Sequence, residues 1–198
     1  MSRLVVVPIV EGHGEDAAIR LLLNRIWIEV VRGEYLDVLK PIRAKRNKLV
    51  QAAELGRLIE LAALKLQDRQ GDDRRLIFVL VDADKDAPDE LRQRLADTAR
   101  ASHPHLDIFC AVANVEYETW FVASAESLVD YLILAESDPP SDPEAAAAGK
   151  CWIASRFKGT KYSETVDQPA MTAKMDLELC RSRSKSFDLL CRELERRR

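Results

Sequence analysis

Acidic residues follow three apolar stretches that are typical of buried strands. Glu11 comes directly after LVVVPIV, Asp82 and Asp84 follow LIFVLV, and Glu116 and Glu118 follow the stretch that ends at Val112. Open parallel sheets bind ligands beyond the carboxyl ends of their strands, so these acids lie where chemistry is expected. Carboxylates that meet there repel one another unless they share a cation. Mg²⁺ and Mn²⁺ prefer oxygen ligands, and the pattern therefore predicts a divalent metal site.

The elements that must position these acids alternate between strands and helices. Apolar runs predict strands over residues 4–10, 36–42, 76–84 and 108–112. Helical spacing predicts helices over residues 19–30, 49–67 and 88–101. This alternation indicates an α/β protein with a mostly parallel sheet of about four strands and helices on both faces. Pro8 suggests an edge or a bulge for the first strand, because proline lacks the N–H that a ladder needs.

The pattern changes after Val115. Residues 116–134 look helical, residues 135–149 are polar and rich in proline, and residues 150–198 again predict helices. We therefore expect an α/β core over residues 1–134, a mobile loop over 135–149, and a helical C-terminal extension over 150–198 that packs on the core.

Charge is distributed unevenly along the chain. The net charge of −3 argues against a protein that coats nucleic acid by charge alone. A basic stretch that contains Arg43, Lys45, Arg46 and Lys48 nevertheless predicts a contact with nucleic acid. The alternative is that this stretch is only a solvated loop.

The sequence also bears on the compartment. The apolar run at residues 4–10 is too short to cross a bilayer, and we expect neither a signal peptide nor a membrane span. The four cysteines are widely spaced and form no CxxC pair. They predict buried, reduced thiols and hence a cytoplasmic protein.

The glycine-containing turn and the paired aspartates together resemble the Toprim domain of topoisomerases, primases and overcoming-lysogenization-defect nucleases. Glu11, Gly12 and Glu15 match its EGxxE turn, and Asp82 and Asp84 match its DxD pair. The resemblance implies a Toprim- or Rossmann-like fold. It also implies that Glu11 is a general acid/base or a metal ligand, and that Asp82 and Asp84 hold Mg²⁺ or Mn²⁺.

Two longer segments resemble a small family within that group. VEYETWFVAS (115–124) and KYSETVDQPAMTAKMD (161–176) are similar to proteins catalogued as domain of unknown function 4276. Members of that family are often encoded beside an ATPase. The resemblance therefore implies an AAA- or ABC-type ATPase partner and a role in a defence system, and it leaves a homodimer open.

These features predict a Mg²⁺- or Mn²⁺-dependent phosphodiester hydrolase, a nuclease or phosphoesterase acting on nucleic acid, with DNA favoured over RNA and the choice between them left open. Glu116 and Glu118 are expected to complete the metal site, although residues two apart on a helix face different ways. Lys158 and Lys161 are expected to approach the negative charge that develops on phosphate, as a lysine does in related nucleases.

Other interpretations stay open. The chain could be a non-catalytic accessory module that binds a nucleic-acid end or steadies an ATPase. Asp82 and Asp84 could be turn acids before the helix near Pro88, and Glu15 could merely favour a helix N-terminus. A haloacid-dehalogenase-like phosphatase fits less well, because its DxD pair usually lies on the first strand of the core.

Overall fold

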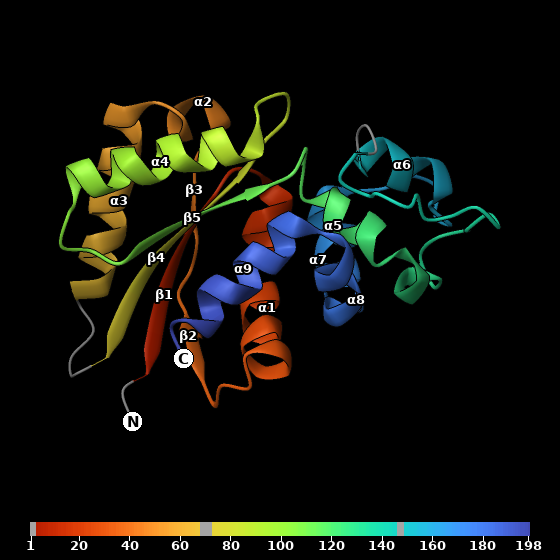
Figure 1. Ribbon diagram of the computed structural model, residues 1–198, viewed down its shortest axis with the longest axis horizontal. Helices are drawn as coiled ribbons and strands as arrows, with labels where there is room; N and C mark the ends of the chain where they lie inside the picture. The colour runs from red at the N-terminus through yellow and green to blue at the C-terminus, as the bar shows by residue number, and fades with distance from the viewer. Residues whose placement is uncertain (1–2, 68–72, 146–148) are drawn as a thin grey trace.

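The computed structural model describes residues 3–67, 73–145 and 149–198, and their centre is a five-stranded parallel sheet (Figure 1). Its strands are β1 (Leu4–Val10), β2 (Leu36–Val38), β3 (Ile42–Arg43), β4 (Arg74–Asp82) and β5 (Ile108–Ala113). Their order is β2-β1-β4-β5, and β3 pairs with the second half of β1. The α/β class and the parallel sheet are confirmed.

Helices cover both faces of the sheet (Figure 1). One face carries α2 (Arg46–Leu49), α3 (Ala52–Gln67) and α4 (Pro88–Ser102), and the other carries α1 (His13–Arg25) and α9 (Lys185–Glu195). Val5 and Val7 pack under α3 and α4, whereas Leu4 and Val6 pack against the opposite layer. A continuous apolar run is therefore needed in β1, because both of its faces are buried.

The predicted strand over residues 36–42 is wrong in one respect, because it is split into β2 and β3. Pro8 explains the split. It lies in β1, which is a central strand and not the predicted edge strand. The carbonyls of Val6 and Val10 accept hydrogen bonds from Leu39 and Ala44 on the β2–β3 side. Pro8 has the same orientation in the strand, so its missing N–H faces the gap between β2 and β3.

The continuous helix predicted over residues 116–134 is also wrong. The structure has α5 (Glu118–Ala123) followed by a short 3₁₀ helix, η2 (Ala125–Leu128). Ser124 ends α5, and its hydroxyl donates to the carbonyl of Trp120 at 3.0 Å. Ser127 donates likewise to the carbonyl of Ser124 at 2.6 Å. Such hydroxyl bonds to the preceding turn compete with regular helix.

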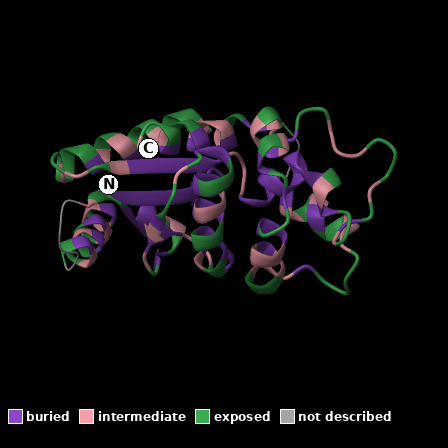
Figure 2. Cartoon of the chain, turned by 90° about the horizontal axis from the view of Figure 1, so that it is seen from below, coloured by how far each residue is buried: buried purple, intermediate pink, exposed green. Residues whose placement is uncertain are grey.

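The C-terminal part is helical, as predicted. It contains α6 (Gly149–Arg156), α7 (Glu164–Thr172), α8 (Leu177–Arg183) and α9. Phe187 and Leu190 of α9 share one apolar core with α1 and the sheet, and Figure 2 shows buried residues running through both parts. Of the segment predicted to be a mobile loop, residues 146–148 lie outside the described residues.

The lengths of the helices and the burial of the cysteines bear on the predicted compartment. In the described part of the chain, no helix is long and apolar enough to cross a membrane. All four cysteines are free thiols; Cys110, Cys180 and Cys191 are buried as expected, but Cys151 is exposed.

We predict that Gly149→Ala destabilises the protein, because α6 begins in backbone contact with α5. A Cβ at Gly149 would lie 2.7 Å from the amide nitrogen of Thr119 and 2.9 Å from the carbonyl carbon of Glu118. Overpacking of this kind costs about 1–3 kcal/mol. Urea denaturation should show a corresponding fall in the free energy of unfolding.

The matched control is Gly56→Ala in α3. A Cβ there would meet only Ser102 at 3.7 Å, which is an ordinary contact. Because alanine favours helix over glycine, this variant should gain about 0.5–1 kcal/mol. Equal stability of the two variants would contradict the close backbone contact between α6 and α5.

Candidate active site

Acidic side chains gather where β1, β4 and β5 end. Glu11 follows β1, Asp82 is the last residue of β4, and Glu118 begins α5 shortly after β5. The chain after β5 folds back over β4, since the amide of Tyr117 donates to Oδ1 of Asp82 at 3.0 Å. We call Glu11, Glu15, Asp82 and Glu118 the carboxylate cluster. The charges of the other three members all raise the pKa of Asp82, which places the four groups together.

Two residues with left-handed backbone shape the loops around the cluster. Asp84 has φ 51° and Val115 has φ 62°. The loops are joined directly, because the amide of Asp84 donates to the carbonyl of Val115 at 2.8 Å. A β-branched residue rarely adopts positive φ, and such backbone strain tends to occur at functional sites.

Glu15 combines a helix-capping role with membership of the cluster. Gly12 is the N-cap of α1, and the Glu15 carboxylate returns to it from the first turn, in the position that a capping box gives to glutamate. A Cβ on Gly12 would lie 2.2 Å from Oε2 of Glu15, so the glycine makes room for this return. The interpretation of Glu15 as a helix N-terminal acid is thus supported, but the same side chain is buried with only 8% of its surface exposed.

Several buried oxygen atoms around the cluster lack a hydrogen-bond partner among the described residues. They are Oε2 of Glu11, Oε2 of Glu15, Oγ1 of Thr119 and Oε1 of Gln168. The α7 residue Gln168 reaches the turn closely, since a Cβ on Gly14 would lie 1.6 Å from its Oε1. Buried acceptors without donors cost free energy, and they fit a site that takes up protons or a cation.

Burial makes ionisation of the cluster costly. Desolvation, with the nearby charge of Asp84, raises the pKa of Glu11 to about 7. Desolvation also raises the pKa of Glu118 to about 7 and that of Glu15 above its ordinary value. The pKa of Asp82 lies well above its ordinary range, for the same reason and because its acidic neighbours repel. Full ionisation of the four carboxyl groups is therefore unfavourable unless positive charge is supplied.

Asp84 lies near Glu11 but pairs with a basic residue. Its Oδ2 lies 2.7 Å from Nε of Arg46, and 56% of the side chain is exposed. Arg46 also binds Asp86 at 2.8 Å and donates to the carbonyl of Ala83 at 3.0 Å. Arg46 thus holds the loop after β4, and the sharing of one ion by Asp82 and Asp84 stays a prediction.

Glu116 and Glu118 face different partners, in line with the expectation that only one of them points inward. Glu116 accepts a hydrogen bond from the amide of Lys150, and its Oε2 lies 3.8 Å from the Lys150 ammonium. Glu118 is only 2% exposed and accepts a hydrogen bond from the Tyr162 hydroxyl at 2.9 Å. Glu118 therefore belongs to the cluster, whereas Glu116 lies at its boundary.

The lysine of this region is Lys150, which sequence reasoning missed. Its Nζ lies 3.0 Å from Glu164 and interacts with Glu118, and these acids raise its pKa. The predicted Lys158 instead directs its ammonium to the carbonyl of Val129, and Lys161 is exposed. No sequence spacing linked Lys150 to the strand ends, because α6 is brought there only by its contact with α5.

The four basic residues predicted to contact nucleic acid have different surroundings in the structure. Arg43 and Lys45 are exposed near the end of β1, because β3 pairs with Ile9 and Val10. Lys48 lies 3.7 Å from Glu54, and Arg46 is engaged with the loop after β4. The exposed pair remains available for a phosphate, whereas Arg46 has a structural partner.

The carboxylate cluster does not form a preassembled metal site. Among residues 3–67, 73–145 and 149–198, no group of three or more His, Cys, Asp or Glu side chains is arranged to hold a metal ion. The unpartnered oxygens of Glu11 and Glu15 and the raised pKa of Asp82 nevertheless fit a hard cation. Ion binding would require a small rearrangement of side chains that now face Arg46, Lys150 or Tyr162.

We predict that stability in the absence of divalent ions falls as the pH rises. The pKa of Glu118 is about 7 in the folded protein against an ordinary value of 4.5, so the unfolded chain releases this proton first. The free energy of unfolding should therefore decrease between about pH 4.5 and 7 and then level off. Urea denaturation in EDTA across this range measures the effect.

Glu118→Gln should flatten this dependence by an amount on the order of 2 kcal/mol, since one pKa unit corresponds to about 1.4 kcal/mol. Glutamine keeps the acceptor for Tyr162 but cannot ionise. Glu90→Gln, on the exposed side of α4, is the control and should behave as the wild type. An unchanged slope in Glu118→Gln would contradict the proposed burial of a protonated carboxyl group.

Comparison with known proteins gives one result. No curated protein and no solved structure matches the chain. The model of the family described as domain of unknown function DUF4276 matches residues 10–195, which include the carboxylate cluster and all the C-terminal helices that surround it. The chain therefore belongs to the DUF4276 family.

Proposed function

We propose that this protein is a divalent-metal-dependent phosphodiester hydrolase of the Toprim type that acts on nucleic acid in the cytoplasm. The observation that carries the proposal is the convergence of four buried or half-buried carboxyl groups, two of which (Glu11 and Glu15) have an unpartnered oxygen, near the carboxyl ends of three parallel strands. Their burial and mutual repulsion raise their pKa values, and Mg²⁺ or Mn²⁺ would compensate their charge at neutral pH.

Glu11 and Asp82 are the side chains best placed to hold the cation, with Glu15 and Glu118 beside them. When bound, the metal supplies a Lewis acid for the phosphoryl oxygen and lowers the pKa of coordinated water. Glu11, whose pKa is about 7, has the proton affinity required of a general base near neutral pH. Lys150 contributes fixed positive charge beside Glu116 and Glu164.

A nucleic-acid substrate is supported by basic side chains at the same edge of the sheet. Arg43 and Lys45 are exposed where β3 runs along the end of β1, directly before Glu11. Phosphate contacts of this kind position a polyanion without reading its sequence. We propose DNA as the substrate, on the resemblance to DNA-cleaving Toprim proteins.

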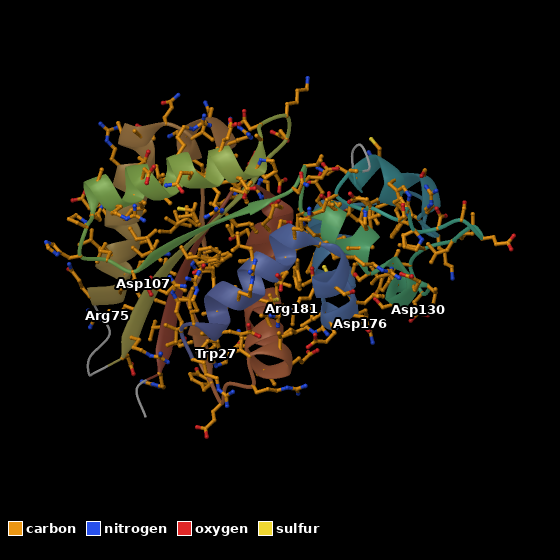
Figure 3. The ribbon with its side chains drawn as sticks, viewed as in Figure 1. Trp27, Arg75, Asp107, Asp130, Asp176 and Arg181 are labelled. Atoms are coloured by element: carbon orange, nitrogen blue, oxygen red, sulfur yellow. The ribbon has the colours of Figure 1, made fainter. Side chains whose placement is uncertain are left out.

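The direct test is Mn²⁺ binding and cleavage of DNA by wild type and Asp82→Asn. Wild type should bind Mn²⁺ in calorimetry with release of protons near pH 7, because the cluster is partly protonated there. Asp82→Asn should lose binding, and cleavage should fall about 100-fold or more. Asp130→Asn, an exposed acid after η2 (Figure 3), is the charge-matched control. Equal titrations of both variants would exclude Asp82 as a ligand.

Removal of the Arg46 side chain should also change the affinity of the site for Mn²⁺. Arg46 holds Asp84 and lies close enough to lower the pKa of Glu11. Arg46→Met retains the length of the side chain but removes a positive charge beside the cluster, so Mn²⁺ affinity should rise several-fold. Arg100→Met, on α4, controls for the change in net charge. A weaker Mn²⁺ affinity in Arg46→Met would show that Arg46 organises the site instead of competing with the ion.

A non-catalytic accessory module is the second candidate. It is favoured by the ion pair that withdraws Asp84 and by the lack of a preassembled metal group among the described residues. Such a module would steady an ATPase subunit, in line with the genes that accompany similar proteins. A pull-down with the neighbouring ATPase distinguishes the two: retention by Asp82→Asn, without Mn²⁺-dependent cleavage by wild type, would favour the module.

A further inference from the structure

A pocket lies at the opposite end of the sheet from the carboxylate cluster. Its volume is about 510 Å³, and it is found where β1 and β4 begin, since Leu4 pairs with Arg74. The residues that line it are Arg3, Leu4, Trp27, Arg32, Gly33, Glu34, Tyr35, Arg74 and Arg198. Figure 3 places Trp27 at this end of the molecule, close to the last turn of α9.

The lining is strongly basic. Of the described residues around the pocket, four are arginines and one, Glu34, is acidic. Arg3 is paired with Asp73 at 3.2 Å, and Arg74 donates to the main-chain carbonyl of Arg198 at 3.1 Å. Arg32 is exposed and makes no hydrogen bond or ion pair within the described chain. The pocket thus presents more guanidinium donors than its own residues satisfy.

A buried donor in the wall of the pocket also lacks an acceptor. Trp27 is only 3% exposed, and its indole Nε1 has no hydrogen-bond partner among the described residues. It lies against Gly33, where a Cβ would approach it to 2.1 Å, so this position requires glycine. An unpaired indole N–H is unfavourable, and an oxygen atom of a ligand would satisfy it.

We infer that this pocket binds a phosphate ester. Guanidinium groups form paired hydrogen bonds with phosphate oxygens, and a phosphate offers enough oxygens for several arginines at once. The half-exposed ring of Tyr35 supplies apolar surface for the organic part of the ligand. The carboxylate cluster takes no part in this binding, because it lies at the other end of the strands.

The test is binding of inorganic pyrophosphate and of a short fluorescein-labelled oligothymidylate, both in EDTA. Wild type should bind at least one probe. Arg32→Ala should weaken binding about tenfold, which corresponds to about 1.4 kcal/mol, because a charge-assisted hydrogen bond is lost. Trp27→Phe keeps an aromatic ring but removes the N–H, and it should weaken binding a few-fold. Tighter binding of pyrophosphate identifies a small phosphate ester, and tighter binding of the oligonucleotide identifies a nucleic-acid strand.

Two controls keep the result separate from the metal site. Arg100→Ala removes one exposed arginine from α4 and should bind as the wild type does. Asp82→Asn should also bind normally, because EDTA removes any contribution of divalent ions. Failure of both probes to bind, or equal losses in Arg32→Ala and Arg100→Ala, would overturn the inference whether or not the protein cleaves DNA.

Discussion

Repulsion among poorly solvated carboxyl groups is the constraint around which the carboxyl end of the sheet is built. Three parallel strands end side by side, and their acids cannot separate without breaking the sheet. The protein compensates in three ways: the pKa values of Glu11 and Glu118 rise to about 7, Tyr162 donates to Glu118, and Arg46 and Lys150 supply positive charge nearby. Each of these interactions neutralises only part of the charge of the cluster. A shared cation would therefore complete the proposed site.

The strands and the helices of the core could be predicted from sequence because their signals are local. Apolar runs gave β1, β4 and β5, and periodic leucines gave α3. The two errors have local physical causes that pattern reading underestimates. Pro8 faces the gap between β2 and β3, so a proline was tolerated in a central strand, and the hydroxyl of Ser124 ended a helix that the apolar pattern would have continued.

The site was predictable only in part, because half of it is assembled by non-local packing. Glu11, Asp82 and Glu118 follow strands, and their meeting is a consequence of parallel topology. Lys150 and Gln168 come from helices that reach the cluster through close contacts at Gly149 and Gly14. Nothing in the spacing of the sequence encodes these contacts. Arg46, predicted to contact nucleic acid, was instead found on Asp84, since a neighbouring carboxylate in the fold competes for the same guanidinium.

The two ends of the sheet carry opposite chemistry, and this separation bears on how a polyanion could use the protein. Acids accumulate at the carboxyl end, where they would repel phosphate until positive charge is bound. Arginines accumulate at the amino end, where phosphate is attracted without any cofactor. A phosphate ester held at the arginine pocket is therefore separated from the carboxylate cluster by the length of β1. Phosphate binding at the arginine pocket and the proposed hydrolysis at the carboxylate cluster are consequently separate properties of one domain. Each depends on the residues at its own end of the strands.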